Sequence, residues 1–450
     1  MRSNKYISTK IYSVYIVLSL FASLLCLHMG MESINDRPLF LLPLSYGLML
    51  AVCRNLRKNF LSLSVIIINT VCLIRFALYP TILIVENYTC FSTESIYLLT
   101  YDCIAVLLFL NLYSRRLSNA NSPNVREKHM RLGVVNKLLI LITLILVLID
   151  PSLLSFFAYF GGKSGVSGAI SILFSVGMVV MYVTVLTKLS KFKSLSGFAL
   201  VVALMFACIY LFLSSFGEEN VQRWNFLFIG IPTIFILIYS FAKYRKLIIT
   251  VSSTAIILSI FIGSFLKFSI SEISVNSFIS NFIDSESLGE YFGGLSGITN
   301  SLLFLRDNYY AISFESTLTD LFGNMPIISH YFNTDLYSTE SLYLDALGRT
   351  DLICPLLTQS VLHFGVLGAP VLSIIMVIIA VESDCYSKTT RSMYSMFGAI
   401  TMCVIFSMFM CLNTTILMPN AWKYIIYLIV QYINEKIYLH GKTIYNSAGV

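Results

Sequence analysis

Long apolar runs separated by short polar stretches dominate the chain. A run of about 17 to 25 mostly apolar residues is long enough to cross the ~30 Å hydrocarbon core of a bilayer as a helix. We expect twelve such helices, at residues 11–29, 38–53, 60–84, 96–113, 138–160, 168–187, 195–214, 226–242, 247–267, 354–381, 392–412 and 421–439. The first run lacks a cleavage site of small residues, so we interpret it as an uncleaved helix. The pattern predicts an all-α polytopic membrane protein.

Basic residues fall mainly in alternate loops of this predicted layout. With the N-terminus inside, 22 of the 30 lysines and arginines lie in the cytoplasmic loops or at the two termini. Short cytoplasmic loops collect Lys and Arg, so this bias sets the orientation. We therefore expect both termini in the cytoplasm and an even number of helices.

One segment, residues 268–353, interrupts the pattern of short loops and lies on the predicted outer face. It holds eleven of the 23 carboxylates against two arginines, Arg306 and Arg349. A loop of this length in a compact protein is usually functional. Its many Tyr, Phe and Leu residues argue against disorder, so we expect short helices there. The whole chain, 1–450, is then a single membrane domain with one large outer loop before its last three helices.

The composition agrees with a membrane protein. Hydrophobic residues make up 57% and charged residues 12% of the chain, whereas soluble domains carry roughly 25% charged residues. The net charge of +7 is explained by basic loops facing an anionic leaflet, so we expect no nucleic-acid partner. The ten cysteines form no CxxC pair or Cys/His cluster, and the motifs of soluble nucleotide-binding enzymes and hydrolases are absent. We expect neither a metal nor a cofactor.

The end of the outer loop gathers the most informative polar residues. Glu340 and Tyr343, or Asp345 and Arg349, stand three or four positions apart and would share one face of a helix. The guanidinium of Arg349 could hold a phosphate or carboxylate with two hydrogen bonds. The alternative is a local ion pair between Arg349 and Asp345 or Asp351.

Other charged residues leave two interpretations open. Arg306 could bind an anion or pair with the adjacent Asp307, and Arg223, on another outer loop, could bind an anionic head group or pair with nearby glutamates. His330 and His363 are candidates for a base, although a lone histidine is more often structural. Because a charge inside a membrane helix is costly, Arg75 should face a cavity or a partner such as Asp102 or Asp150.

The run GRTDLICPLLTQSVLHFGVLGAPVL, from Gly348 through Leu372, resembles the end of the large periplasmic loop and the next helix of Wzy-type O-antigen polymerases. In that family a polar loop with a basic residue leads into an apolar helix with an aromatic-Phe-Gly-x-x-Gly pattern. Here His363 stands at the aromatic position, and Phe364, Gly365 and Gly368 follow. The layout of twelve helices with one large outer loop is also similar.

The resemblance implies a glycosyltransferase of the bacterial inner membrane. It would move glycan from undecaprenyl pyrophosphate onto a lipid-linked repeat unit, with these lipid-linked saccharides, membrane lipid and a chain-length regulator protein as partners. We expect catalytic roles for Arg349, His363, Asp351, His330 and Glu340, and substrate binding by Arg306, Arg223, Tyr343 and Asp345. Two alternatives remain: an O-antigen ligase, and a flippase or transporter of lipid-linked oligosaccharides.

Overall fold

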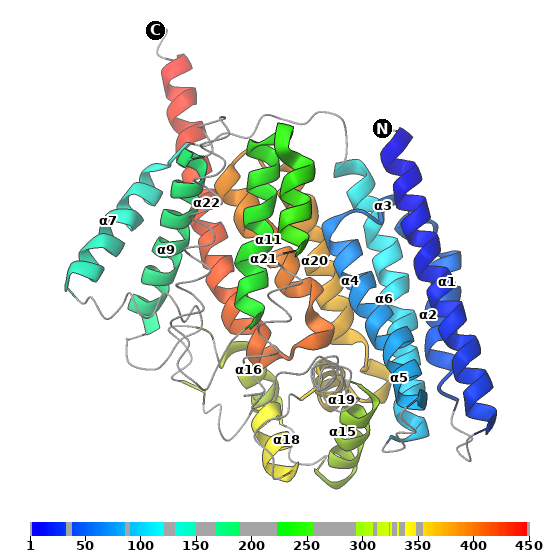
Figure 1. Cartoon of the computed structure of the whole chain (residues 1–450). Helices are drawn as coiled ribbons and strands as arrows, with labels where there is room; N and C mark the ends of the chain where they lie inside the picture. The colour runs from blue at the N-terminus through cyan, green and yellow to red at the C-terminus, as the bar shows by residue number, and fades with distance from the viewer. Residues whose placement is uncertain are drawn as a thin grey trace, which may run out of the picture. The chain divides into compact units, whose positions relative to one another are not determined.

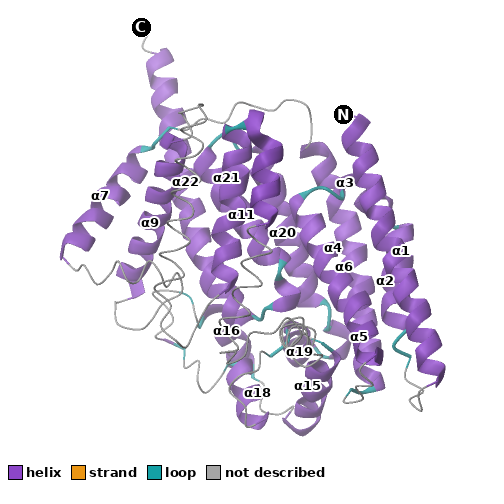
Figure 2. Cartoon of the chain, in the orientation of Figure 1, coloured by secondary structure: helices purple, strands orange, loops and turns teal. Residues whose placement is uncertain are grey.

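The computed structural model describes most of the chain as helices. The described residues are 2–32, 38–85, 91–120, 131–149, 168–189, 223–254, 294–308, 313–323, 325, 331–332, 338–347 and 354–447. This part of the chain contains no β-strand (Figure 2). The protein is therefore all-helical wherever the structure describes it, as the sequence predicts.

The helices, in chain order, have the following bounds. They are α1 (Arg2–Glu32), α2 (Leu41–Val52), α3 (Arg54–Asn59), α4 (Leu63–Leu73), the π-helical turn η1 (Ile74–Leu78), α5 (Tyr79–Val85), α6 (Thr93–Ala120), α7 (Val134–Ile149), α9 (Gly168–Leu189) and α11 (Arg223–Ser240). Further along are η2 (Ala242–Tyr244), α15 (Leu295–Asn308), α16 (Phe314–Phe322), α18 (Thr339–Leu347), α19 (Leu356–Phe364), η5 (Val366–Gly368), α20 (Val371–Thr389), α21 (Met393–Ser407), η6 (Phe409–Cys411) and α22 (Thr414–Ser447).

Four segments are long and apolar enough to span a membrane. They are Ser8–Met29, Leu63–Ile84, Thr93–Ser118 and Val366–Thr389, and a bent pair, Leu227–Ser240 with Ala242–Thr254, is a fifth if it forms one span. Shorter apolar helices cover Leu41–Val52, Val134–Ile149, Leu173–Lys188 and Met393–Ser407. Of the expected spans, 195–214 and the ends of 138–160 and 247–267 lie outside the described residues.

The chain divides into two compact units. The first comprises Met1–Pro123, Glu272–Cys385 and Cys403–Met418, and the second comprises Asn124–Ser271, Tyr386–Met402 and Pro419–Val450. In the first unit α1 packs on α2 and α5, and α6 packs on α2, α3 and α4. Figure 1 shows these helices, coloured blue to cyan, running side by side.

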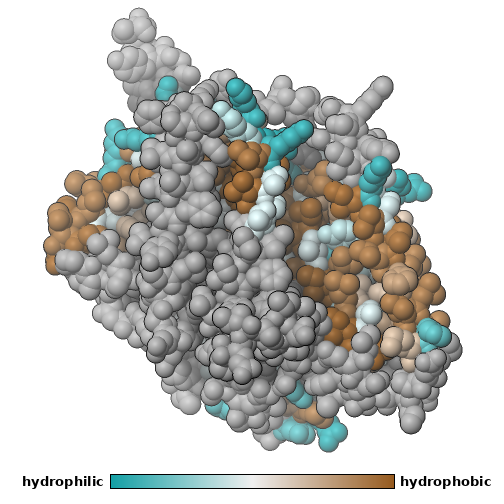
Figure 3. All heavy atoms as spheres, viewed as in Figure 1, coloured by the Kyte–Doolittle hydropathy of each residue, from teal (hydrophilic) through white to brown (hydrophobic). Residues whose placement is uncertain are grey.

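The apolar faces of several helices remain exposed. On α1 the side chains of Val17, Phe21 and Leu24 are 64%, 58% and 65% exposed, and on α7 Leu148 is 82% exposed. Figure 3 shows brown, hydrophobic surface over α7 and over the helices of the first unit. A soluble monomer rarely exposes so much contiguous apolar surface, so these faces are suited to contact with lipid.

Two residues of opposite charge, Arg75 and Asp102, are buried inside the first unit. Arg75, in the wider turn η1 that joins α4 to α5, is 4% exposed, and Asp102 on α6 is fully buried. The two side chains interact electrostatically. Of the two partners predicted for Arg75, Asp102 lies close enough to interact with it electrostatically, and Asp150 lies outside the described residues.

The prediction of one continuous helix at 354–381 is wrong, because the structure has two helical segments there. The structure has a short helix, α19, which ends at Phe364, and a separate spanning segment from Val366 to Thr389. Gly365 between them has φ +72° and ψ 176°, a conformation that is essentially restricted to glycine. The residues on both sides of this break are apolar, so the apolar pattern alone predicts one segment instead of two.

Short helices of the expected outer loop pack at one end of the first unit. Helix α15 packs against α6, α18 and α19, while α16 packs against α18 (Figure 1). The hydroxyl of Thr299 on α15 accepts a hydrogen bond from the backbone N–H of Ser92, 2.9 Å away at the start of α6. These contacts fix the short helices beside the first turn of α6.

At their opposite ends, helices of the first unit are joined by hydrogen bonds and an ion pair. The carboxylate of Asp384 on α20 accepts hydrogen bonds from the Ser64 backbone N–H at 3.0 Å and from the Ser64 hydroxyl at 2.9 Å. Ser64 lies in the first turn of α4, whose N–H groups have no partner within the helix. Arg116 of α6 pairs with Glu382 of α20 nearby.

The second unit is joined by polar contacts between apolar helices. The amides of Asn136 on α7 and Gln431 on α22 exchange two hydrogen bonds of 3.0 Å. Tyr182 of α9 hydrogen-bonds to Thr233 of α11 at 2.8 Å. Buried amides and hydroxyls paired in this way fix which faces of neighbouring helices meet.

Candidate functional site

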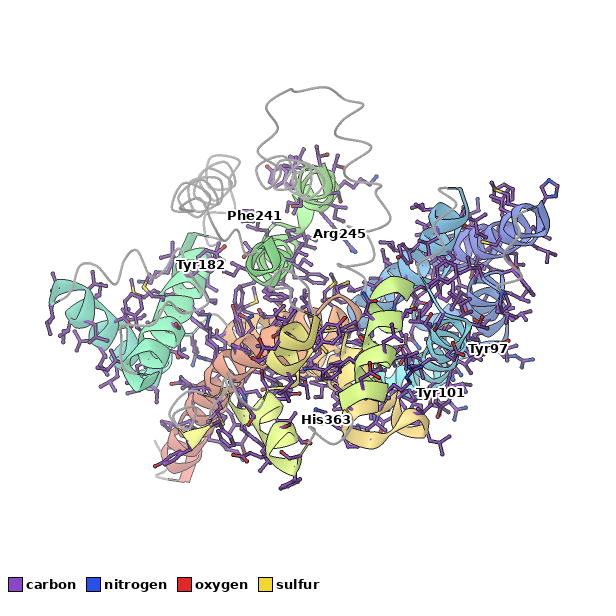
Figure 4. The ribbon with its side chains drawn as sticks, turned by 90° about the horizontal axis from the view of Figure 1, so that it is seen from below. Tyr97, Tyr101, Tyr182, Phe241, Arg245 and His363 are labelled. Carbon is purple, nitrogen blue, oxygen red and sulfur yellow. The ribbon has the colours of Figure 1, made fainter. Side chains whose placement is uncertain are left out.

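A buried histidine and aspartate meet among the short helices of the first unit. His363 Nε2 on α19 lies 2.9 Å from Asp320 Oδ2 on α16, and their side chains are 3% and 1% exposed. Figure 4 labels His363 in a view from below. Because α19 ends at Phe364, directly before the unusual backbone of Gly365, His363 occupies the last turn of a helix that stops beside α16.

The other nitrogen of His363 also has a partner. Its Nδ1 lies 2.9 Å from the hydroxyl oxygen of Thr317, one turn before Asp320 on α16. An ionised carboxylate only accepts hydrogen bonds, so the ring donates Nε2–H to Asp320, and its neutral form accepts the Thr317 hydroxyl proton at Nδ1. The arrangement Thr317–His363–Asp320 is that of a hydroxyl next to a base that a carboxylate orients.

Asp320 is held by further donors. Its Oδ1 accepts the backbone N–H of Thr339 at 3.0 Å, and its Oδ2 accepts the Thr339 hydroxyl. Thr339 is the first residue of α18, so the carboxylate satisfies an N–H group that the helix itself leaves unpaired and faces the positive end of the helix dipole. Asp320 is therefore fixed by α18 as well as by His363.

Gln359 connects this cluster to the start of α22. Its Nε2 donates to Thr339 Oγ1 at 2.9 Å and to Asp320 Oδ2 at 3.3 Å. Its Oε1 accepts the backbone N–H and the hydroxyl of Thr414, the first residue of α22, at 3.0 and 3.1 Å. One fully buried amide thus uses its donor and its acceptor to join α16, α18, α19 and α22.

Glu340 lies next to this network. Asn413, whose Oδ1 caps α22 by accepting the Ile416 N–H at 3.0 Å, donates its amide to the Glu340 carboxylate. Burial raises the pKa of Glu340 above its ordinary value, and the negative charge of Asp320 adds to this effect. Hydrogen bonds from Thr415 and Asn413 oppose the rise in pKa. Glu340 therefore keeps its proton to a higher pH than an exposed glutamate does.

Apolar side chains follow His363 directly and are exposed. Phe364 is 46%, Val366 61% and Leu367 88% exposed, and the Tyr101 hydroxyl of α6 donates to the Leu367 carbonyl at 3.0 Å. Tyr101 and Tyr97, one turn apart on α6, are exposed as well (Figure 4). The buried polar cluster thus borders a surface of aromatic and aliphatic side chains.

The structure brings together only part of the predicted site. His363 and Glu340 belong to the cluster, whereas Arg306 is exposed at the end of α15, 3.6 Å from Asp307, and Asp345 is exposed on α18. Tyr343 is buried, where its ring packs edge-on against Phe304 with 5.8 Å between centroids.

Four of the predicted site residues lie, with their side chains, outside the described part of the chain. Arg349, Asp351 and His330 lie outside the described residues. Arg223 is the first residue of α11, but its side chain is not described. The predicted roles of these four residues therefore remain predictions.

Sequence reasoning did not single out Asp320, Thr317, Gln359 or Thr414. Asp320 is one of eleven carboxylates in its segment, and its partners stand 19 to 43 positions further along the chain. The one local signal is the spacing of Thr317 and Asp320, which places both on the same face of a helix.

Within the described residues, no three His, Cys, Asp or Glu side chains form a group able to hold a metal ion. No protein-family model matches the chain, and the searches of curated proteins and of solved structures returned no significant match. The fold and site define a helical protein with several apolar helices able to span a membrane and a buried His–Asp pair.

Proposed function

We propose that this protein is a Wzy-type polysaccharide polymerase of the bacterial inner membrane. It transfers an undecaprenyl-pyrophosphate-linked glycan onto a lipid-linked repeat unit at the periplasmic face. The observation that carries the proposal is the buried His363–Asp320 pair, 2.9 Å apart, on short helices next to an exposed apolar surface. The resemblance of residues 348–372 to this family supports the same conclusion.

The His–Asp pair suits the removal of a proton from a sugar hydroxyl. The acceptor oxygen attacks the anomeric carbon of the donor, the bond from that carbon to the pyrophosphate oxygen breaks, and the electron pair leaves with the pyrophosphate. His363 takes the acceptor proton as general base. Asp320 holds the ring in one tautomer and stabilises the imidazolium that forms, as the carboxylate does in other His–Asp pairs.

The leaving group needs a positive charge near it, because negative charge builds up on the pyrophosphate in the transition state. We assign this role to Arg349, fourteen positions before His363 in the chain. Asp351, His330, Arg223 and Arg306 remain second choices, on the grounds given by the sequence. Glu340, beside the pair and largely buried, has the role of binding a sugar hydroxyl.

The proposal includes a topology of twelve spanning helices, with residues 268–353 in the periplasm and both termini in the cytoplasm. Two sets of contacts support it. Helix α15 of the outer loop is hydrogen-bonded to the start of α6, and the charge pattern predicts that this end of α6 lies on the outer face of the membrane. Residues predicted to lie near the cytoplasm, Ser64 with Asp384 and Arg116 with Glu382, pair with one another.

The exposed surface beside His363 suits a lipid-borne substrate. A polyprenyl chain remains in the bilayer while its sugar is transferred, so the site must open toward lipid. Phe364, Val366 and Leu367 provide apolar side chains at this position. Tyr97 and Tyr101 add aromatic rings of the kind found at membrane interfaces.

Deletion of the gene in its host, followed by electrophoresis of the lipopolysaccharide, tests the proposed function. The deletion strain should make core with a single repeat unit and no ladder, and wild-type protein should restore the ladder. His363→Gln and Asp320→Asn should fail to restore it, because general base catalysis typically contributes about 10²- to 10⁴-fold in rate. His28→Gln, at an exposed histidine near the end of α1, is the matched control and should restore the ladder.

Other gel patterns contradict the polymerase assignment. Bare core with lipid-linked polymer accumulating indicates a ligase. Bare core with unpolymerised repeats retained on the cytoplasmic side indicates a flippase. A ladder restored by His363→Gln, with normal amounts of protein in the membrane, removes the His–Asp pair from the mechanism.

A further inference from the structure

His363 has no free ring nitrogen with which to reach a substrate. Nε2 is bonded to Asp320 and Nδ1 to Thr317, each at 2.9 Å, and the imidazole side chain is only 3% exposed. An acceptor hydroxyl would therefore have to displace Thr317 or Asp320 before it could contact a ring nitrogen directly. The hydroxyl of Thr317 is the group bonded to Nδ1, the nitrogen that Asp320 does not occupy.

Thr317 is better placed than His363 to contact a substrate. It lies in the middle of α16 and is half-buried, whereas the side chains of Asp320 and His363 are almost completely buried. A threonine hydroxyl can donate one hydrogen bond and accept two. Donation to His363 Nδ1 leaves the Thr317 oxygen able to accept a hydrogen bond from a second hydroxyl.

We infer that Thr317 relays the proton between the acceptor sugar and His363. In the transfer step the sugar hydroxyl gives its proton to Thr317 Oγ1 while Thr317 gives its own hydroxyl proton to His363 Nδ1. The sugar oxygen forms its bond to the anomeric carbon, the pyrophosphate leaves with the electron pair, and Thr317 ends the step as a neutral hydroxyl. This inference rests on the proposed glycosyl transfer and adds Thr317 as the catalytic residue that touches the acceptor.

The relay is tested with purified protein in proteoliposomes that contain the lipid-linked repeat unit isolated from the deletion strain. Thr317→Val keeps the shape of the side chain but removes the hydroxyl, and should lower the rate by about 10²-fold or more. Thr317→Ser keeps the hydroxyl and should remain within about tenfold of wild type, since it restores the proton path. A rate for Thr317→Val equal to that of wild type overturns the relay.

Thr319→Val is the matched control on the same helix. Thr319 is 1% exposed, and its hydroxyl makes no hydrogen bond within the described part of the chain. The substitution removes a buried hydroxyl of the same kind without touching His363, and its rate should equal that of wild type. A loss as large as that of Thr317→Val would mean that α16 tolerates no such change, which overturns the assignment to Thr317.

Two measurements on wild-type protein do not depend on how the variants fold. In a single turnover, a relay moves two protons together, so the rate should depend on the deuterium fraction of the solvent along a curve. A straight line indicates one proton and overturns the relay. A peptide containing glycosylated Thr317 after rapid quenching also overturns it, because it shows a covalent nucleophile.

The two proposals fail in distinguishable ways. If His363→Gln and Asp320→Asn abolish the ladder while Thr317→Val restores it, polymerisation by the His–Asp pair stands and the relay is wrong. If all three variants restore the ladder, the His–Asp site itself is wrong.

Discussion

Arg75 and Asp102 are the residues whose burial has the clearest energetic consequence. Both lie in apolar spans of the first unit, are almost inaccessible and interact electrostatically. Each charge stabilises the other in a place where one charge alone is costly. Arg75 lies in η1, a π-helical turn. Turns of this kind within α-helices are frequently found at functional sites.

Removal of Arg75 alone should be strongly destabilising. Arg75→Leu leaves Asp102 as an uncompensated buried charge, which typically costs about 3–5 kcal/mol. The double variant Arg75→Leu/Asp102→Leu should recover much of the folded protein, measured as monodisperse tagged protein after extraction into detergent. Arg306→Leu, at a side chain that is 81% exposed, is the control for loss of an arginine. A double variant as unstable as the single one would contradict this explanation.

Glu340 should make stability depend on pH. Burial, with a contribution from Asp320, raises its pKa above the ordinary value of 4.5, so the folded protein keeps this proton at pH values where the unfolded chain has lost it. The stability from this group is complete below that ordinary value and is lost as pH rises through the folded-state pKa. Glu340→Gln keeps an oxygen that accepts the Asn413 amide but cannot ionise.

The upward shift of the Glu340 pKa determines how the stability of wild type and Glu340→Gln should compare. Thermal unfolding in detergent should show wild type losing stability relative to Glu340→Gln as the pH is raised from 4.5 to neutrality, and the two should converge at the acid end. Glu315→Gln, at an exposed position on the same group of short helices, should show no comparable difference. Parallel curves for wild type and Glu340→Gln at all pH values would contradict the assigned burial.

At the scale of elements, the joint between α19 and the following span depends on Gly365. Its backbone conformation costs other residues about 1–3 kcal/mol, although a Cβ there would meet no atom within 4 Å. Gly365→Ala should therefore lower stability through the backbone alone and should also reduce activity, because His363 lies two residues earlier. Thermal unfolding and the lipopolysaccharide ladder measure the two effects.

Gly297→Ala is the control for Gly365→Ala. Gly297 lies inside α15, where an added Cβ would meet only Pro355 Cγ at 3.6 Å, an ordinary contact. Alanine favours a helix over glycine by about 1 kcal/mol, so this variant should be at least as stable as wild type. Equal effects at both positions would show that the backbone of Gly365 does not matter.

The elements also show where sequence reasoning works and where it stops. The length of the apolar runs predicts the positions of α1, α2, α4 to α6 and α9, because a membrane span needs a long run of apolar residues. The same rule fails at Gly365, where α19 and the next span are both apolar and only the glycine separates them. His363 was a candidate because it is a histidine near the outer loop. Asp320 was not, because its role depends on partners brought together by tertiary packing.

At the scale of the whole molecule, the predicted orientation can be measured directly. Alkaline phosphatase is active only outside the cytoplasm, and a fluorescent protein at the C-terminus fluoresces only inside it. A phosphatase fusion after Gly323 should be active, one after Lys188 should be inactive, and the C-terminal fusion should fluoresce. The excess of basic residues in alternate loops is the physical reason. Activity after Lys188 together with a dark C-terminus would reverse the topology.

The amide of Gln359 has a consequence for the timing of synthesis. Thr414, which it binds, is made 55 residues after Gln359. At a translation rate of about 5–20 residues per second, roughly 3–11 s pass before the ribosome supplies this partner. During that interval α16, α18 and α19 have been made, but Thr414, the hydrogen-bond partner of Gln359 Oε1, has not. The newly made protein therefore contains His363 and Asp320 but lacks one of the contacts that hold the helices around them in place. A ribosome that stops before residue 414 should therefore leave a chain that is inserted and inactive.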